Sequence, residues 1–463
     1  MSMSLIESLN QTGMDLEIHR PGDTTFDALA DRFKTHPGVE ADYVVAVRPG
    51  DAKAAQHAVA AAHAHGAGLL TAFNASNVGA RLCGDGNTVI LDLSRLDRVL
   101  EVDVANGYAR VEPGVSYAAL SAYLAEHGHA LQVDSERDGA ASIVGSTFAK
   151  GIGYTPYGEH ALVQCGAEFA TPYGELVRTG MGAMPGSKTW QLYKYSLGPY
   201  SDGLAMQSGL LVPTQIGVWL MGQVPVTQTL AYEIANTQAL SEVMEALREF
   251  KIANLLPGTV SLTHREFDEA RHPENATSEW RLTSALYGLP NLIALARATI
   301  DGALSAIADV RAVSVEEQAG SPVWQEQAAL VSGQPGVAGV SFPGIDASHA
   351  ASLTMVAPIE DRFALAMGGH AKEALAQHGL PFLTEMAVVG RSLFQKIYLP
   401  YTPFNPRSEE RLAESARQLV TAMQQQGIGV AAQSFELAGL GLGRDTGSGL
   451  AKLHRKIETA LTA

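Results

Sequence analysis

Ser142-Ile-Val-Gly-Ser-Thr-Phe-Ala-Lys-Gly-Ile-Gly-Tyr-Thr-Pro-Tyr-Gly-Glu-His160 is the most informative stretch of this 463-residue chain. Its glycines permit positive φ angles and close approach of the backbone, and they are Gly145, Gly151, Gly153 and Gly158. Backbone N–H groups in such a loop can hold a phosphate or a ring carbonyl, and Thr155 and His160 add polar side chains. Taken alone, the stretch is more typical of a tight loop between strands than of a binding site, so the flanking sequence is needed to distinguish the two.

The residues before this stretch predict short strands and two helices. Residues 43–47, 69–71 and 88–93 are apolar and strand-like. An Asn106-Gly107 turn joins two further strands, at 99–102 and 108–111. Helices are expected over 52–65, after an N-cap at Asp51, and over 116–127, and a glycine stops each of them.

The residues after the stretch predict a hairpin at 161–181, a strand within 208–222 and then a change of pattern beyond Pro225. There, longer helices alternate with strands. The helices are expected at 238–251, 279–309, 361–378 and 408–426, and the strands at 259–264, 353–357, 382–388 and 396–401. This pattern predicts a second α+β domain over 223–427, followed by a tail, 428–463, that ends in a helix.

Composition and charge exclude several classes of protein. The net charge of −16 and the pI near 5.3 argue against binding nucleic-acid phosphates. Cys83 and Cys165 are too few for a disulfide framework and fit a reducing compartment. No apolar run approaches the ~18 residues of a membrane span, and the acidic N-terminal segment has no apolar core, so a cytoplasmic protein is expected. His63 with His65, and His264 with His272, lack a third ligand, so no metal site is predicted.

Three segments together resemble a known family. They are Thr88-Val-Ile-Leu-Asp-Leu-Ser-Arg-Leu-Asp-Arg-Val-Leu-Glu-Val102, Gly151-Ile-Gly-Tyr-Thr-Pro-Tyr-Gly-Glu-His160 and Leu176-Val-Arg-Thr-Gly-Met-Gly-Ala-Met-Pro-Gly-Ser-Lys-Thr-Trp-Gln191. The last is followed by Leu197-Gly-Pro-Tyr-Ser-Asp-Gly-Leu204. These residues look like the vanillyl-alcohol oxidase/4-cresol dehydrogenase flavoproteins, in register over most of 43–222 and more loosely through 427.

The resemblance implies an α+β fold. Residues 1–222 would form a PCMH-type FAD-binding domain of two subdomains. Residues 223–427 would form an inserted α+β (ferredoxin-like) cap domain, and 428–463 would return to the FAD-binding domain. The resemblance also implies a homo-oligomer and oxidation of a 4-substituted phenol, by hydride transfer to flavin through a quinone methide.

Two departures from the family's pattern concern the cofactor. Phe73 lies in the pyrophosphate loop, 71–80, where relatives carry glycine, and its ring is expected to obstruct close approach of phosphates. Leu353 stands where relatives often carry the His or Tyr that tethers FAD, so no covalent bond is expected; His349 would need a shift of register.

Two more departures concern the chemistry. Arg137 stands where relatives carry an acid near the flavin, although Glu136 or Asp138 could substitute. Residues 430–432 (Val-Ala-Ala) stand where a Tyr-Arg pair of relatives binds the phenolate. A buried charge without a partner is costly, so the sequence shows no phenolate anchor at that position.

Two functions from different classes remain. The first is an FAD-dependent oxidoreductase that acts on a small aromatic or phenol-like substrate with non-covalently bound FAD. The alternative is a flavin-free descendant. It would be either a pseudoenzyme partner of an active paralogue or an enzyme that reuses the empty cleft for a non-redox reaction.

The catalytic candidates are Arg137, Asp138 and Tyr398. Tyr398, like Tyr401, alternates with apolar residues and could instead pack within a strand. The expected cofactor contacts lie in the pyrophosphate loop, the glycine-rich stretch and a later strand. They are Asn74, Ser76, Asn77, Ser142, Gly145, Gly151, Gly153, Tyr154, Thr155, Gly158, His160, Val212 and Ile216.

Overall fold

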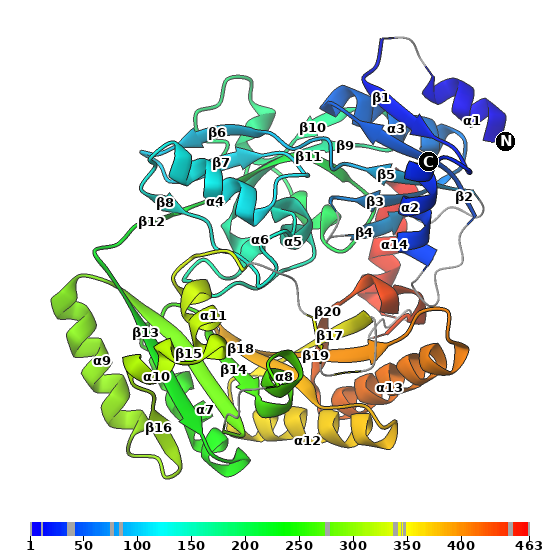
Figure 1. The fold of residues 1–463 in the computed structure, drawn as a ribbon. Coiled ribbons are helices and arrows are strands. Elements are labelled where there is room, and N and C mark those ends of the chain that lie inside the picture. Colours follow the sequence, from blue (N-terminus) through cyan, green and yellow to red (C-terminus); the bar gives the residue numbers. More distant parts are fainter. Residues whose placement is uncertain are drawn as a thin grey trace.

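The computed structural model describes residues 2–10, 13–34, 42–74, 78–82, 87–273, 278–336, 341–343, 345, 349–442 and 448–461. In Figure 1 these residues form two halves, one above the other, each with its own sheets. The upper half holds most of the chain's first half, and the lower half holds the strands from residue 226 onward.

The first sheet of the upper half has the strand order β1-β2-β5-β3-β4. Its strands are β1 (Leu16–His19), β2 (Tyr43–Pro49), β3 (Gly68–Ala72), β4 (Val78–Leu82) and β5 (Thr88–Asp92). The three central strands are parallel, because α3 (Ala52–Ala64) carries the chain from β2 back to the start of β3. Helix α2 (Thr24–Lys34) covers one face through Phe26 and Phe33, which pack on Ala46, Leu70 and Ile90 of the three central strands.

The second sheet of the upper half is antiparallel, with the order β10-β9-β11-β7-β6. Its strands are β6 (Val99–Asp103), β7 (Tyr108–Val111), β9 (Gln164–Ala170), β10 (Leu176–Arg178) and β11 (Val212–Trp219). A single core joins the two sheets and contains Val45 and Val89 from the first and Ala167 and Ile216 from the second. Helices α4 (Tyr117–Glu126) and α5 (Ile143–Phe148) contribute to the same core.

The lower half, called the cap here, has an antiparallel sheet ordered β16-β13-β15-β14-β18-β19-β17-β20. Its strands are β13 (Val226–Ile234), β14 (Val260–His264), β15 (Trp280–Gly288), β16 (Val310–Ala312), β17 (His349–Pro358), β18 (Leu383–Val389), β19 (Ser392–Tyr401) and β20 (Gly429–Gln433). The outer face packs on four helices to form the largest core. They are α7 (Thr237–Ile252), α9 (Pro290–Leu304), α12 (Asp361–Gln377) and α13 (Pro406–Gln425).

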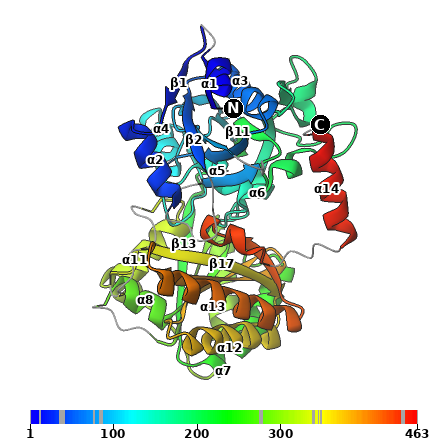
Figure 2. The same ribbon diagram turned by 90° about the vertical axis from the view of Figure 1, so that its right-hand side faces the viewer.

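The opposite, inner face of the cap sheet carries α8 (Arg265–Arg271) and α11 (Pro322–Val331). Figure 2 shows α12 and α13 on the side of the cap away from the upper half. Side chains alternate along each strand, so the residues between the core positions point to the inner face. That face is the one that meets the upper half.

The predicted α+β fold is confirmed, and the two sheets of the upper half are consistent with the predicted two subdomains, with local corrections. The helix predicted over 279–309 is wrong in its first part, which is strand β15, and only 290–304 is helical. The cap sheet extends past the expected boundary at 427, because β20 pairs with β17. Helix α14 (Gly449–Leu461) has no buried residue and lies at the level of the upper half in both views. Among the described residues, no helix is both long and apolar enough to cross a membrane.

Candidate functional site

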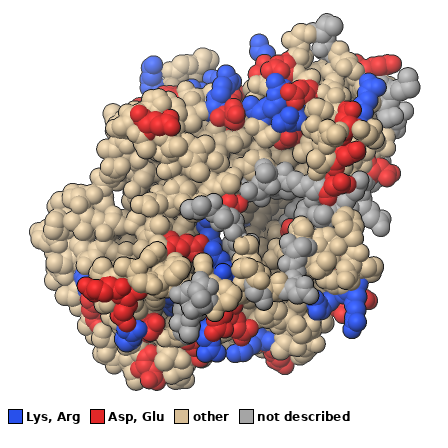
Figure 3. Space-filling model, in the orientation of Figure 1, with Lys and Arg blue, Asp and Glu red and all other residues tan. Residues whose placement is uncertain are grey.

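The candidate site lies where residues 132–160 of the upper half rest on the inner face of the cap. The Gly139 N–H donates to the Gly336 carbonyl at 3.1 Å. Gly158 lies so close to Thr259 that a Cβ at Gly158 would be 2.5 Å from the threonine Oγ1. Figure 3 shows a hollow between the halves at this level, with acidic and basic side chains next to each other in it. Gly158 is therefore needed for the contact between the halves.

The first group of site residues is a buried set of hydrogen bonds around His160, called the His160 network here. Nε2 of His160 lies 2.8 Å from Oδ2 of Asp134, and Nδ1 lies 2.8 Å from the Tyr117 hydroxyl and 2.9 Å from Oγ of Ser146. The Ser146 hydroxyl also donates to Glu136. His160 is 3% exposed and Ser146 0%, so these polar atoms depend on one another for hydrogen bonds.

The His160 network also fixes the glycine-rich loop. Asp134 accepts hydrogen bonds from the backbone N–H groups of Tyr154 at 3.1 Å and Thr155 at 2.6 Å. A Cβ at Gly153 would be 1.5 Å from Oδ2 of Asp134, and one at Gly151 would be 2.1 Å from Oε1 of Glu136. In this structure the space left by these two glycines is therefore used by the network's carboxylates.

The second group is centred on Arg137 and is called the Arg137 cluster: Arg137, Arg271, Glu326, Gln327, Glu385 and Tyr398. Arg137 forms ion pairs with Glu385 and, at 3.0 Å, with Glu326, and it donates to Oε1 of Gln327 at 3.3 Å. Arg271 forms a bidentate pair with Glu326 at 2.6 and 2.8 Å. Arg137 comes from the upper half and its acidic partners come from the cap, so the cluster joins the two halves.

Aromatic rings enclose the Arg137 cluster. The Arg137 guanidinium lies 5.7 Å from the ring centroid of Tyr154 and 5.6 Å from that of Phe267. Phe267 and Phe342 both lie within ring contact of Tyr398, at 5.3 and 5.5 Å between centroids. A flat ligand could stack among these rings while its polar groups reach the charged residues.

The charges of the cluster follow from its surroundings. Burial would raise the pKa of Glu385, but the positive charges of Arg137, Lys396 and Arg271 outweigh burial and lower that pKa. Burial and the neighbouring Glu385 raise the pKa of Tyr398 well above its ordinary value, and its hydroxyl donates to Oε2 of Glu385 at 3.0 Å. Glu385 is therefore an anion and Tyr398 a neutral donor at neutral pH.

The catalytic candidates are only partly brought together. Arg137 and Tyr398 meet at Glu385, from opposite halves of the molecule. Asp138 is half-buried and accepts the Ala140 N–H at 3.0 Å, so it holds a turn and does not join the cluster. Tyr401 is fully buried in the outer core of the cap, which fits the packing role considered for it.

The expected cofactor contacts separate into three places. Asn74 donates to the Ala140 carbonyl at 2.8 Å, next to the start of α5, where Ser142 accepts the Gly145 N–H at 3.0 Å. Among the loop residues, Gly151, Gly153, Tyr154 and Thr155 lie against the carboxylates of the His160 network, His160 is its centre, and Gly158 contacts the cap at Thr259. The side chains of Val212 and Ile216 are buried in the core of the upper half. Ser76 and Asn77 lie outside the described residues.

Phe73 and Asn74 are the described residues at the end of β3, where the FAD pyrophosphate is expected. Phe73 is 5% exposed and packs in the core of the upper half, so the obstruction predicted for its ring is not found. The Asn74 amide donates to the Ala140 carbonyl, and the Gly145 N–H donates to Ser142, so these groups hold the end of β3 against the start of α5. Leu353 points into the outer core of the cap, and its neighbours on the opposite face are Ser352 and Thr354, so neither face offers a tether at this point.

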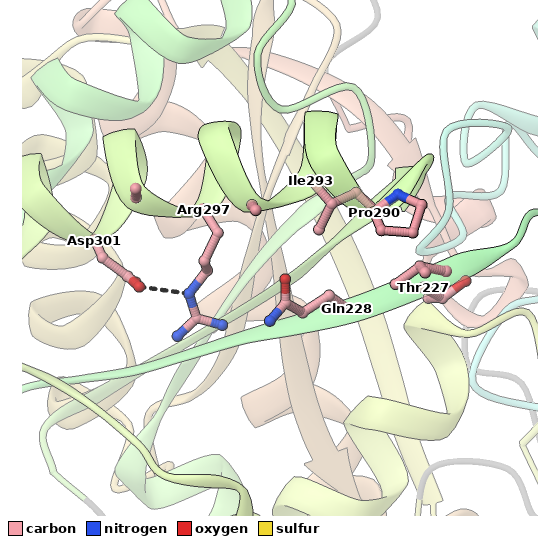
Figure 4. Close-up of a pocket in the computed structure, with 9 residues that line it drawn as sticks. Thr227, Gln228, Pro290, Ile293, Arg297 and Asp301 are labelled. Carbon is pink, nitrogen blue, oxygen red and sulfur yellow. Dashed lines mark hydrogen bonds and ion pairs between the residues drawn. The ribbon is translucent and has the colours of Figure 1, made fainter.

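A separate cavity of about 520 Å³ lies elsewhere in the cap, between β13 and α9 (Figure 4). Its charged residues already pair with each other, because Nε of Arg297 lies 2.6 Å from Oδ2 of Asp301. Arg297 also donates to the Thr229 carbonyl at 3.2 Å. No residue predicted for the site lines this cavity.

The sequence prediction missed most of the partners at the site. Asp134 and Ser146 lie inside or next to the glycine-rich stretch but were not selected. Glu326 and Arg271 give no local signal. Glu385 could have been found, because it is a lone charge in the otherwise apolar or neutral strand β18. A buried charge in such a strand needs a partner and so points to a site.

Comparisons with known proteins place the chain among flavoprotein relatives. The FAD binding domain family matches residues 44–180. The chain is 28% identical to the 4-cresol dehydrogenase [hydroxylating] flavoprotein subunit of Pseudomonas putida over 373 residues, which are 74% of this chain and 70% of that protein. It is 29% identical to the 1'-carboxy-chondrochloren decarboxylase of Chondromyces crocatus over 221 residues, which are 47% of this chain and 40% of that protein.

Solved structures show the same fold. The 4-ethylphenol oxidase of Gulosibacter chungangensis matches with a TM-score of 0.88 at 23% identity, over 99% of this chain and 94% of that one. P-cresol methylhydroxylase matches with a TM-score of 0.86 at 24% identity, over 99% and 93%. These likenesses do not favour the flavin-free alternative. The chain therefore contains an FAD binding domain over residues 44–180, is homologous to the 4-cresol dehydrogenase flavoprotein subunit, and shares its fold with these two solved structures.

Proposed function

We propose that the chain is an oxidoreductase that binds FAD without a covalent bond and oxidises a small aromatic compound at the Arg137 cluster. The convergence of Arg137 and Tyr398 on Glu385 carries the proposal, because it places a cation, a hydroxyl donor and an anion among aromatic rings. The matching proteins are named for cresol, ethylphenol and a carboxylated compound, which supports an aromatic substrate. When bound, the flavin supplies the two-electron acceptor.

The cluster replaces the phenolate anchor that relatives carry near the end of the cap. Residues 430–432 lie on edge strand β20 and contain no Tyr or Arg. Arg137 brings the positive charge from the upper half instead, and Tyr398 brings the hydroxyl from the cap. Three nearby cations, Arg137, Arg271 and Lys396, favour an anionic substrate, and the neutral Tyr398 hydroxyl is a hydrogen-bond donor beside them.

The absorbance spectrum of the purified protein tests this proposal directly. Flavin bands are expected as isolated or after titration with FAD, and acid precipitation is expected to release all the flavin into the supernatant. Anaerobic addition of a 4-alkylphenol should then bleach the bands. A protein that shows no flavin bands and takes up no FAD would refute the proposal. Flavin that stays in the acid pellet would refute the non-covalent binding.

We further propose a cytoplasmic homo-oligomer without membrane or nucleic-acid partners. The acidic charge and the two cysteines in 463 residues support the compartment, and the family resemblance supports the oligomer. Light scattering coupled to size-exclusion chromatography would give a mass of at least two chains, whereas a monomer would refute this part.

A further inference from the structure

The Arg137 cluster contains buried donors that the protein leaves without an acceptor. They are Nε and Nη1 of Arg137, Nε of Arg271 and Nε2 of Gln327. Arg137 is 4% exposed and Gln327 0%. Nη1 of Arg137 lies 3.0 Å from Glu326, but not in hydrogen-bonding geometry. Buried donors are almost always satisfied, so this concentration of free N–H groups indicates a ligand with several acceptor atoms.

The formal charges of the same corner are unbalanced. Arg137, Arg271 and Lys396 all act on Glu385, and Glu326 is the second acid in contact with the two arginines. Three positive charges thus face two negative ones. The nearby Arg281 forms a bidentate pair with Asp268 at 2.9 Å, so it does not change this balance. The excess charge is that of Lys396, which is half-buried, and one additional negative charge would make the cluster neutral.

We propose that the Arg137 cluster is a binding site for an aromatic carboxylate, with the carboxylate at the free donors of Arg137, Arg271 and Gln327. A carboxylate has two oxygens and about four lone-pair positions, whereas a phenolate has a single oxygen, so the carboxylate satisfies more of these donors. The rings of Tyr154, Phe267 and Phe342 hold the aromatic part. The binding site stands without flavin chemistry, but the inference that this carboxylate is the substrate rests on the proposed function.

Titration calorimetry with matched probes tests the site. Benzoate and benzamide have nearly the same shape and differ in charge, and phenol has the ring and one oxygen. On the purified full-length protein, benzoate is expected to bind at least about tenfold more tightly than benzamide or phenol, because charge-assisted hydrogen bonds are roughly twice as strong as neutral ones. Equal affinities, tighter binding of phenol, or no benzoate binding would overturn the inference.

Two substitutions at Gln327 tie the binding to this corner. Gln327→Leu removes a free donor, and Gln327→Glu adds the missing negative charge in place. Each is expected to weaken benzoate binding about tenfold or more, from the loss of one hydrogen bond to a charged group. Gln325→Leu is the control, because Gln325 is exposed on the same helix α11. Circular dichroism checks that the variants fold, and unchanged benzoate affinity in both Gln327 variants would refute the site.

The outcomes separate this inference from the proposed function. Benzoate binding that is lost in the Gln327 variants of a protein without flavin would support the site and refute the flavin chemistry. A protein whose flavin is reduced by 4-alkylphenols but which does not bind benzoate would support the flavin chemistry and refute the carboxylate site.

Discussion

The His160 network and the Arg137 cluster adjoin each other at Glu136 and Arg137, but they are held together differently. The network draws all of its members from residues 117–160 and depends on hydrogen bonds within the upper half. The cluster draws its members from the upper half and from α8, α11, β18 and β19 of the cap, and it depends on formal charges.

Because of this difference, the Arg137 cluster depends on the association of the two halves, whereas the His160 network does not. Removing a hydrogen bond from the network leaves neutral or singly charged groups that remain close to other donors. Removing a charge from the cluster leaves buried partners uncompensated on the other half of the molecule, and this costs more free energy. Substitutions in the Arg137 cluster are therefore expected to destabilise the protein more than substitutions in the His160 network.

Arg137→Ala is expected to have the largest effect. It leaves the buried Glu385 without its ion-pair partner, whereas Glu326 keeps Arg271, and breaking a buried ion pair in this way costs about 3–5 kcal/mol. The midpoint of urea unfolding, followed by circular dichroism, should fall accordingly. Arg311→Ala is the control, since Arg311 is half-exposed and pairs with Glu233 on the surface, and it should barely move the midpoint. Equal shifts in the two variants would show that the cluster does not join the halves.

Glu326 should make the stability of the protein sensitive to acid. Burial raises its pKa, but hydrogen bonds from Arg271 and the charge of Arg137 outweigh burial and lower the pKa from its ordinary 4.5 to about 2. Because the folded pKa is the lower one, the stabilisation is present above about pH 4.5 and is lost as pH falls toward 2. The shift corresponds to about 3 kcal/mol. The urea midpoint of unfolding, measured from pH 4.5 down to pH 2, should fall less steeply with pH for Glu326→Gln than for the wild-type protein. The same dependence on pH in both proteins would contradict the prediction.

The fold could largely be predicted from the sequence because its signals are local. Asp51 and Ser116 cap helices that were predicted over nearly their full length, and the change of pattern beyond Pro225 coincides with the first long strand of the cap. The main error, at residues 280–288, also has a local cause. Leu282 and Leu286 face the outer core while Arg281 and Thr283 face inward, and this alternation was masked by the helix that follows directly.

The site was less predictable because its charges are brought together only by tertiary structure. Arg137 and Tyr398 could be selected one by one, but nothing in the sequence relates either of them to Glu385 or Glu326. Glu385 reaches Tyr398 through the pairing of β18 with β19, and Arg137 reaches both acids through the contact of the halves. Val212 and Ile216 were selected by resemblance for their backbone, and in the structure their side chains serve the core.

Gly153→Ala tests the His160 network with an intermediate effect. The new Cβ would be 1.5 Å from Oδ2 of Asp134 and 2.8 Å from Nε2 of His160, so the bond between Asp134 and His160 has to break. Overpacking of this kind costs about 1–3 kcal/mol. The matched change, Gly203→Ala, meets nothing within 4 Å and should be nearly neutral. If both alanines shift the unfolding midpoint alike, the close approach at Gly153 does not matter.

Ser146→Ala should have the smallest effect on stability, and it tests whether the His160 network and the Arg137 cluster are coupled. It removes one buried hydroxyl between His160 and Glu136, at about 1 kcal/mol for a hydrogen bond. Combined with Arg137→Ala in a double-mutant cycle, its cost should add within about 0.5 kcal/mol, as for sites that share no partner. A larger coupling would mean that Glu136 transmits the charge of Arg137 into the network, and the two regions would then have to be treated as one site.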